Sequence, residues 1–216
     1  MTLSAWRSLA SNLVPPLCVE ADVTNAEQLD GFIDATLSKF GRLDGAVNNA
    51  GRSAGTSVAV SDDAEWCSDY ELKVVAALHV ARRVLPALED TGGSTLNVLA
   101  TLARTPHANT TPTSASRAAG LAFTKSLANE VGPRGIRANA ILIGLMESGQ
   151  WVRRAADTSM TLEEYYVKMA EGSTIPLGRV GRSEEFADFA TYLLSPRASY
   201  ITGVGINIDG GLSPVI

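Results

Sequence analysis

Residues 94–143 read STLNVLATLARTPHANTTPTSASRAAGLAFTKSLANEVGPRGIRANAILI, and this stretch decides the fold. Its apolar runs at 94–100 and 136–143 have the length of buried strands. Residues 114–131 between them repeat their apolar side chains at helical spacing. A strand, a helix and a second strand in this order predict a βαβ unit with two parallel strands.

The same alternation continues on both sides of this unit. Further strands are predicted at residues 17–23, 43–48 and 204–208, and further helices at residues 25–40, 64–88, 162–171 and 183–194. Strands that alternate with helices predict an α/β protein whose parallel sheet is covered by helices on both faces. No linker divides the chain, so we expect one domain over residues 1–216.

Composition excludes several classes of protein. The 216 residues are 45% hydrophobic and 19% charged, which argues against a disordered chain. A net charge of −5 argues against nucleic acid as a partner, because phosphate backbones bind concentrated basic surfaces. No apolar run reaches the roughly 18 residues of a membrane span, and the first residues lack a secretory signal pattern. We expect a cytoplasmic protein that acts on a small molecule.

The two cysteines do not form a disulfide framework. Cys18 lies in an apolar run that reads as a strand, so we predict a buried free thiol at this position. No metal site is predicted.

Eight short blocks, in order and spacing, resemble the short-chain dehydrogenase/reductase family over residues 17–212. They are ADVT (21–24), FGRLD (40–44), NNAG (48–51), GGS (92–94), SAS (114–116), GIRAN (135–139), PLGR (176–179) and the pair ITG (201–203) and DGG (209–211). The resemblance implies a Rossmann-like, doubly wound parallel sheet. It also implies a homo-oligomer, a dimer or a tetramer, whose subunits pair through the last strand.

The resemblance marks four positions where the family carries its catalytic asparagine, serine, tyrosine and lysine. This sequence has Lys73, Ala100, Thr113 and Arg117 there. An aliphatic hydroxyl such as that of Thr113 is a far weaker acid than a phenol. Arg117 keeps the positive charge of the lysine but does not release a proton. These substitutions argue against the proton relay of the family.

The front of the sequence also departs from the family. No G-x-x-x-G-x-G loop stands before Asp22, and only sixteen residues precede the first predicted strand, whereas a βαβ unit needs roughly 30. Residues 1–13 resemble the end of the helix that enters the third strand of the family. We therefore expect a fold without the first βαβ unit, and a genuine truncation and a start assigned too late both stay open.

Without that unit, the neighbour of the first predicted strand has to change. Residues 17–23 then pair directly with residues 43–48, pair with another chain, or leave this segment unordered.

The expected site is a cleft at the carboxyl ends of the strands, which the family closes with a substrate lid, here about residues 145–175. The catalytic candidates are Arg117, Thr113, His107, Glu147 and Lys73. The candidates for substrate contact are Thr101, Asn109, Ser148, Gln150 and Trp151. Asp22, Asn48, Ala50 and Gly51 match positions that bind the cofactor in the family and are interpreted as vestigial.

Several candidates also have a purely structural interpretation. His107 lies in a loop, where a lone histidine is usually only solvated. Glu147 can pair with Arg153 or Arg154, and Trp151 can pack within the lid. The NNAG block can serve only to brace neighbouring strands, and Arg117 can serve only to neutralise a carboxylate.

Three functional hypotheses stay open, ranked in this order. The first is a non-redox enzyme that dehydrates, isomerises or cyclises a carbonyl-containing small molecule without a cofactor. In it, Arg117 and Lys73 bind an anion or enolate, and His107 or Glu147 transfers a proton. The second is an NAD(P)-dependent oxidoreductase whose cofactor-binding front segment is missing from the sequence. The third is a catalytically silent subunit that pairs with an active homologue.

Overall fold

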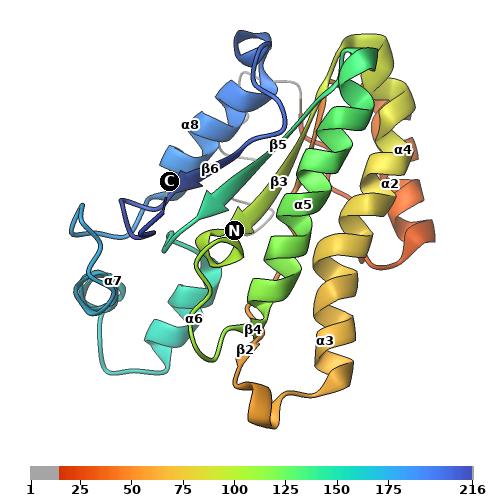
Figure 1. Cartoon of the computed structure of the whole chain (residues 1–216). Helices are drawn as coiled ribbons and strands as arrows, with labels where there is room; N and C mark the ends of the chain where they lie inside the picture. The colour runs from red at the N-terminus through yellow and green to blue at the C-terminus, as the bar shows by residue number, and fades with distance from the viewer. Residues whose placement is uncertain (1–14, 216) are drawn as a thin grey trace.

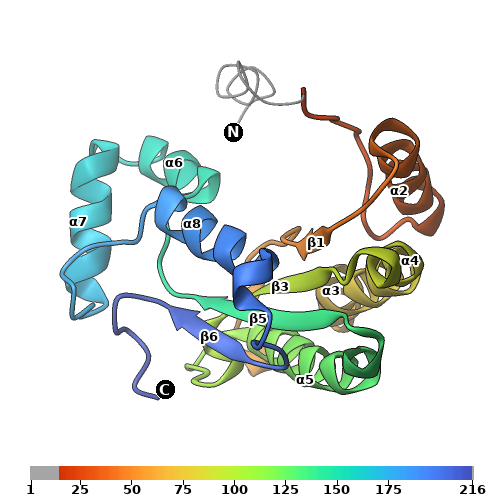
Figure 2. The same cartoon turned by 90° about the horizontal axis from the view of Figure 1, so that it is seen from above.

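Four parallel strands form the main sheet, in the order β1-β3-β5-β6; Figure 1 labels β3, β5 and β6, and Figure 2 labels all four. The structure is a computed structural model that describes residues 15–215. The strands are β1 (Gly45–Asn48), β3 (Ser94–Ala100), β5 (Arg137–Ile143) and β6 (Gly205–Ile208). Each lies within a predicted strand, and the parallel α/β sheet of the family's Rossmann-like type is confirmed.

Helices cover both faces of this sheet (Figure 2). One face carries α2 (Ala26–Phe40), α4 (Ala76–Thr91) and α5 (Thr113–Val131), whose apolar side chains share a core with Ala138 of β5. The other face carries α8 (Ser183–Leu194), whose core includes Ile141 of the same strand. None of the helices within residues 15–215 is long and apolar enough to cross a membrane.

The helix predicted at residues 64–88 consists of three pieces. These are α3 (Asp63–Tyr70), a π-helical turn (Glu71–Val75) and α4. Such turns add a residue to the helical repeat and are frequent at functional sites. The turn carries Lys73 and places its side chain in the protein interior.

The segment after β5 is the one predicted as a substrate lid, at about residues 145–175, and its covering role stays a prediction. It contains α6 (Gly149–Ala156), which the sequence did not predict, and α7 (Leu162–Gly172), which it did. Thr161 and Glu164 form a capping box that fixes the start of α7. Both helices lie beside the ends of β3 and β5, away from α4 and α5 (Figure 2).

A second, two-stranded sheet sits beside the start of α5. Its strands, β2 (Gly55–Thr56) and β4 (Thr111–Pro112), are antiparallel. The sequence did not predict them, because strands of two residues leave no periodic pattern. They bring the loop after β1 against the first turn of α5.

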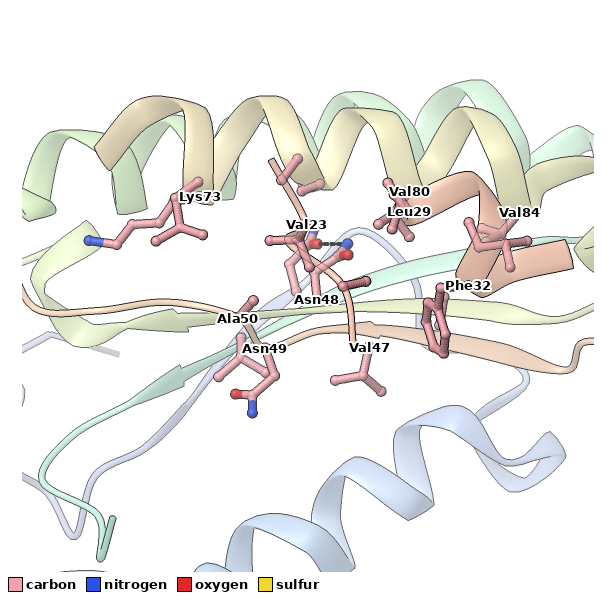
Figure 3. Close-up of a pocket in the computed structure, with 18 of the residues that line it drawn as sticks. Val23, Leu29, Phe32, Val47, Asn48, Asn49, Ala50, Lys73, Val80 and Val84 are labelled. Carbon is pink, nitrogen blue, oxygen red and sulfur yellow. Dashed lines mark hydrogen bonds between the residues drawn. The ribbon is translucent and has the colours of Figure 1, made fainter. Parts of the chain in front are cut away.

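The strand predicted at residues 17–23 is wrong. This segment contains no strand, and β1 pairs only with β3 within the described residues, so direct pairing with residues 43–48 does not form. Residues 17–23 and β1 do not pair because a cavity of about 230 Å³ lies between them, lined by Val23, Leu29 and Phe32 among others (Figure 3). The helix suggested for residues 1–13 lies outside the described residues.

The prediction of a buried thiol at Cys18 is also wrong. Cys18 is exposed, because the segment around it is not part of the sheet. Cys67 on α3 is exposed as well, and both thiols are free.

Arg137, at the start of β5, ties the sheet to α8. Its buried guanidinium donates hydrogen bonds to the backbone oxygens of Leu193 (2.7 Å), Leu194 (3.3 Å) and Ser195 (3.2 Å). These carbonyls end a helix, where the backbone dipole attracts a cation. Burial lowers the pKa of Arg137 below its usual value.

We expect Arg137→Met to lower the free energy of unfolding by about 2–4 kcal/mol, because it leaves helix-end carbonyls without their charged donor. Urea unfolding monitored by circular dichroism measures this change. Arg134→Met is the matched control, since Arg134 forms only a surface ion pair with Glu89, worth about 0–1 kcal/mol. Equal effects of the two substitutions would contradict the proposed role of Arg137.

Candidate active site

A buried polar network joins the end of α3, the π-helical turn and the first turn of α5. Lys73 Nζ donates to Asp69 Oδ1 at 2.5 Å and to Thr113 Oγ1 at 2.9 Å. Ser116 Oγ donates to Asp69 Oδ2 at 2.5 Å. The side chains of Lys73 and Asp69 are 1% and 0% exposed. The network therefore holds a complete ion pair in the interior.

The surroundings of Lys73 favour its release of a proton. Burial lowers the pKa of Lys73, and the positive charges of Arg117 and Arg52 lower it further. The hydrogen bond and charge of Asp69 act in the opposite direction and keep the ammonium form available. Lys73 is thus available as an ammonium group, and it releases its proton more readily than an exposed lysine does.

The hydroxyl of Thr113 is placed as a hydrogen-bond donor. Thr113 is the first residue of α5, and its Oγ1 accepts from the backbone N–H of Ala54 at 2.9 Å as well as from Lys73. A hydroxyl has two acceptor lone pairs and one proton, so both lone pairs are filled and the proton is left to donate. Thr113 donates to no acceptor within residues 15–215. The acceptor that it lacks can come from a ligand.

Arg117 lies one helical turn further along α5. Its Nη1 donates to the backbone oxygen of Val98 at 2.5 Å, while its buried Nε has no hydrogen-bond partner. No carboxylate within residues 15–215 forms an ion pair with it, so the interpretation that it only neutralises a carboxylate does not hold there. Burial lowers the pKa of Arg117.

Two cavities flank β1, and both are lined by Asn49, which follows its carboxyl end. The first is the cavity of about 230 Å³ described above, which Lys73 and Arg117 also line. Figure 3 shows Lys73 on one side of β1, with Val47 and Asn49 pointing to the other side. The second cavity, also of about 230 Å³, lies between the strand ends and the lid, and Asn49 and Ser148 are among its lining residues.

The second cavity brings together four of the predicted lid residues, namely Glu147, Ser148, Gln150 and Trp151. Trp151 Nε1 donates to the backbone oxygen of Met146 at 2.9 Å, and the guanidinium of Arg154 lies 4.9 Å from the Trp151 ring centre. Glu147 forms no ion pair within the described residues, so the interpretation that it pairs with Arg153 or Arg154 is not supported.

The loop candidates stand apart from this site. His107 and Asn109 are exposed, and the backbone oxygen of His107 closes a turn by accepting from Thr110 Oγ1 at 2.6 Å. Asn109 has a left-handed backbone with φ of 63°, which suits a turn residue. Thr101 is buried, and neither cavity is lined by these three residues. Their assignment to the site stays a prediction.

Two of the four positions interpreted as vestigial, Asn48 and Asp22, form side-chain hydrogen bonds within the protein. Asn48 Nδ2 donates to Asn97 Oδ1 at 2.7 Å, and Asn97 Nδ2 donates to Thr124 Oγ1 at 2.9 Å, so Asn48 braces β1 against β3 and α5. Asp22 Oδ1 accepts from the backbone N–H and the hydroxyl of Thr24, and these bonds lower the pKa of Asp22.

The other two, Ala50 and Gly51, follow β1. Ala50 lines the first cavity, and a Cβ added at Gly51 would lie 3.2 Å from Nη2 of Arg117. The missing side chain at position 51 therefore keeps the approach to this guanidinium open.

The sequence reasoning missed Asp69 and Ser116. Asp69 precedes Lys73 by four residues, the spacing of a helical ion pair, and this signal could have identified it. Ser116 lies in the SAS block (114–116), but the sequence does not indicate its contact with Asp69, which depends on how α5 packs against α3.

We expect Lys73→Met to lower the free energy of unfolding by about 3–5 kcal/mol, because it leaves the Asp69 carboxylate buried without its cation. The double variant Asp69→Leu with Lys73→Met removes both charges, so its cost falls well below the sum of the two single variants. Denaturant unfolding of all three proteins tests this, with Lys168→Met on the exposed face of α7 as the control. Additive costs would show that the two charges are not coupled.

Comparison with known proteins gives the same family along nearly the whole chain. The sequence profile described as enoyl-(acyl carrier protein) reductase matches residues 3–213. A putative ketoacyl reductase of the monensin polyketide synthase from Streptomyces virginiae is 33% identical over 200 residues, which cover 88% of this chain and 75% of that protein. The 3-oxoacyl-[acyl-carrier-protein] reductase of Thermotoga maritima is 30% identical over 195 residues and is covered to 74%.

Solved structures agree with these sequence relatives. An NADPH-bound short chain oxidoreductase from Pseudomonas aeruginosa PAO1, described as containing an atypical catalytic center, is 37% identical with a TM-score of 0.84. The match covers 91% of this chain and 76% of that one. L-sorbose reductase from Gluconobacter frateurii, solved with NADPH and L-sorbose, is 30% identical with a TM-score of 0.91 and coverages of 99% and 83%. The chain therefore belongs to the short-chain dehydrogenase/reductase family.

Proposed function

We propose that this protein is an NAD(P)-dependent reductase of a small carbonyl compound, the second of the three hypotheses. The observation that carries the proposal is the Thr113 hydroxyl, which receives a hydrogen bond from Lys73 and keeps its own proton for an acceptor. The relatives support this choice, since those reported above are described as reductases or as an oxidoreductase.

The cavity beneath the lid offers groups that fit the nicotinamide end of such a cofactor. It opens at the ends of β1, β3 and β5, where α/β proteins bind dinucleotides. The buried hydroxyl of Ser148 has no hydrogen-bond partner within residues 15–215 and is free for an amide group. Ser148 and Asn49 are the residues that we assign to this contact. When bound, the reduced cofactor would supply the hydride.

The protein's own part in the reaction is the proton. Thr113 donates its hydroxyl proton to the carbonyl oxygen as the alkoxide forms, and Lys73 passes a proton from Nζ to Thr113 Oγ1 in the same movement. The Thr113 O–H bond that breaks is thus replaced at once, and Lys73 is left neutral until solvent restores its proton. Asp69 is a positioning residue, because it holds Nζ against the hydroxyl.

This relay answers the objection that a threonine is too weak an acid. Thr113 never carries a full negative charge, because the proton that it gives up is supplied by a lysine whose pKa burial has lowered. The proton comes from Lys73 and not from the residue at the family's lysine position, which is Arg117 here. The long side chain of Lys73 reaches the hydroxyl of the shorter threonine.

The non-redox hypothesis has less support. It assigns the proton transfer to His107 or Glu147, and the structure places the first in an exposed loop and the second under the lid. Neither residue lines the cavity that holds Lys73 and Arg117. The network that contains Lys73 therefore favours carbonyl reduction.

We expect saturable binding of NADPH, followed by the change in its fluorescence. Ser148→Ala should weaken this binding about fivefold, which corresponds to the loss of one hydrogen bond of about 1 kcal/mol. Ser199→Ala, an exposed serine far along the chain, is the control and should bind like the parent protein. Absence of any saturable fluorescence change with the parent protein would overturn the proposed function.

A second prediction concerns Thr113. With NADPH and 9,10-phenanthrenequinone as the carbonyl probe, Thr113→Val should lower kcat by roughly 100-fold, since it removes the proton donor. Thr113→Ser should keep most of the rate. Thr111→Val removes a similar hydroxyl, which bonds the backbone oxygen of Thr56, and should change kcat little. A Thr113→Val enzyme with unchanged kcat and unchanged solvent isotope effect would exclude the relay.

A further inference from the structure

One more cation than anion is buried at this site. The network holds the pair Lys73 and Asp69, and Arg117 lies close enough for its charge to act on Lys73, so these three groups sum to a net charge of +1. Lys73 uses that carboxylate at 2.5 Å, and Arg117 forms no ion pair within residues 15–215. Burying an unpaired charge is costly, so proteins normally pair such a group or bind an ion with it.

Arg117 also leaves most of its donors unused. A guanidinium has five N–H groups, and the only hydrogen bond from Arg117 to a described residue goes to the backbone oxygen of Val98. Its Nε is buried and has no partner, and its Nη2 faces the open backbone of Gly51. Arg117 is also one of the residues that line the first cavity.

Arg137 shows what a purely structural buried arginine looks like in this protein. Both of its terminal nitrogens donate to carbonyls at the end of α8, where the helix dipole supplies negative charge. Arg117 bonds no helix end and forms no ion pair within residues 15–215, since the oxygens of Asp69, whose charge does act on it, bond Lys73 and Ser116. A structural role therefore accounts for Arg137 and leaves Arg117 unexplained.

We propose that Arg117 binds the carboxylate of the substrate, and that the substrate is a small 2-oxo or 3-oxo acid. Thr113 and Arg117 are four residues apart on α5, so their Cβ atoms lie roughly 5–6 Å apart on one helix face. That spacing suits one small molecule whose carbonyl oxygen meets Thr113 while its carboxylate meets Arg117. The inference rests on the proposed function and adds the substrate class to it.

A phosphate could in principle meet the same guanidinium, since arginine binds both groups through paired N–H donors. The carboxylate is favoured because the hydroxyl of Thr113, which keeps its proton for a carbonyl oxygen, lies only one helical turn away, and an oxo acid carries both groups in one small molecule. The test below separates the two anions.

The test measures binding without any dinucleotide, so that it does not depend on cofactor binding. The parent protein is titrated by calorimetry with 2-oxobutanoate, 3-oxobutanoate, butanone and inorganic phosphate. We expect saturable binding of at least one oxo acid, and at least tenfold weaker binding of butanone and phosphate. Arg117→Met should weaken the binding of the oxo acid about tenfold or more, and Arg117→Lys should weaken it less, because the charge remains.

Two further variants keep the test decisive. Arg82→Met removes an exposed arginine from α4 and should leave binding unchanged. Gly51→Ala places a methyl group 3.2 Å from Arg117 Nη2. It should weaken the binding of the oxo acid while the charge of Arg117 remains. The proposal is overturned if no oxo acid binds, if butanone binds equally well, if phosphate binds more tightly, or if Arg117→Met binds like the parent protein. NADPH binding together with any of these outcomes would leave the reductase proposal standing and remove only the substrate class.

Discussion

The ion pair between Lys73 and Asp69 is the interaction on which the site depends. Both side chains are buried, so separating the two charges would leave each of them unpaired away from water, at a large cost in free energy. Through Ser116 and Thr113 the pair fixes the first turn of α5, and through Thr113 it reaches the backbone of Ala54 in the loop after β1. Three segments that are distant in sequence are thereby held in one geometry.

The sequence predicted the sheet well where burial is two-sided. Central strands such as β5 are covered by α5 on one face and α8 on the other, and such strands read as unbroken apolar runs. Residues 17–23 also read as a strand but form none, and none of them is buried, because a strand requires a neighbour to pair with and β1 lies across a cavity. An apolar run therefore predicts a strand only where a neighbouring strand lies within hydrogen-bonding distance, which the run itself does not show.

The site was predictable only in part, for a related reason. Alignment to the family blocks placed Lys73, Thr113 and Arg117 at one cleft, and the structure does bring them to adjoining positions. His107 was predicted at the same cleft, and it lies in an exposed turn that lines neither cavity. Residue type suggests what a side chain can do, whereas the packing of α3 against α5 decides which side chains meet.

The residues at the family positions make sense together rather than singly. In the proposed function Thr113 takes the part of the family's tyrosine, and the long side chain of Lys73 reaches its hydroxyl. A buried lysine needs an anion, which Asp69 provides from the previous helical turn. Asp69 is thereby hydrogen-bonded to Lys73 and Ser116, so Arg117 forms no ion pair within residues 15–215. On this proposal the proton relay runs through Lys73 and Thr113, and the charge of Arg117 is left for a ligand.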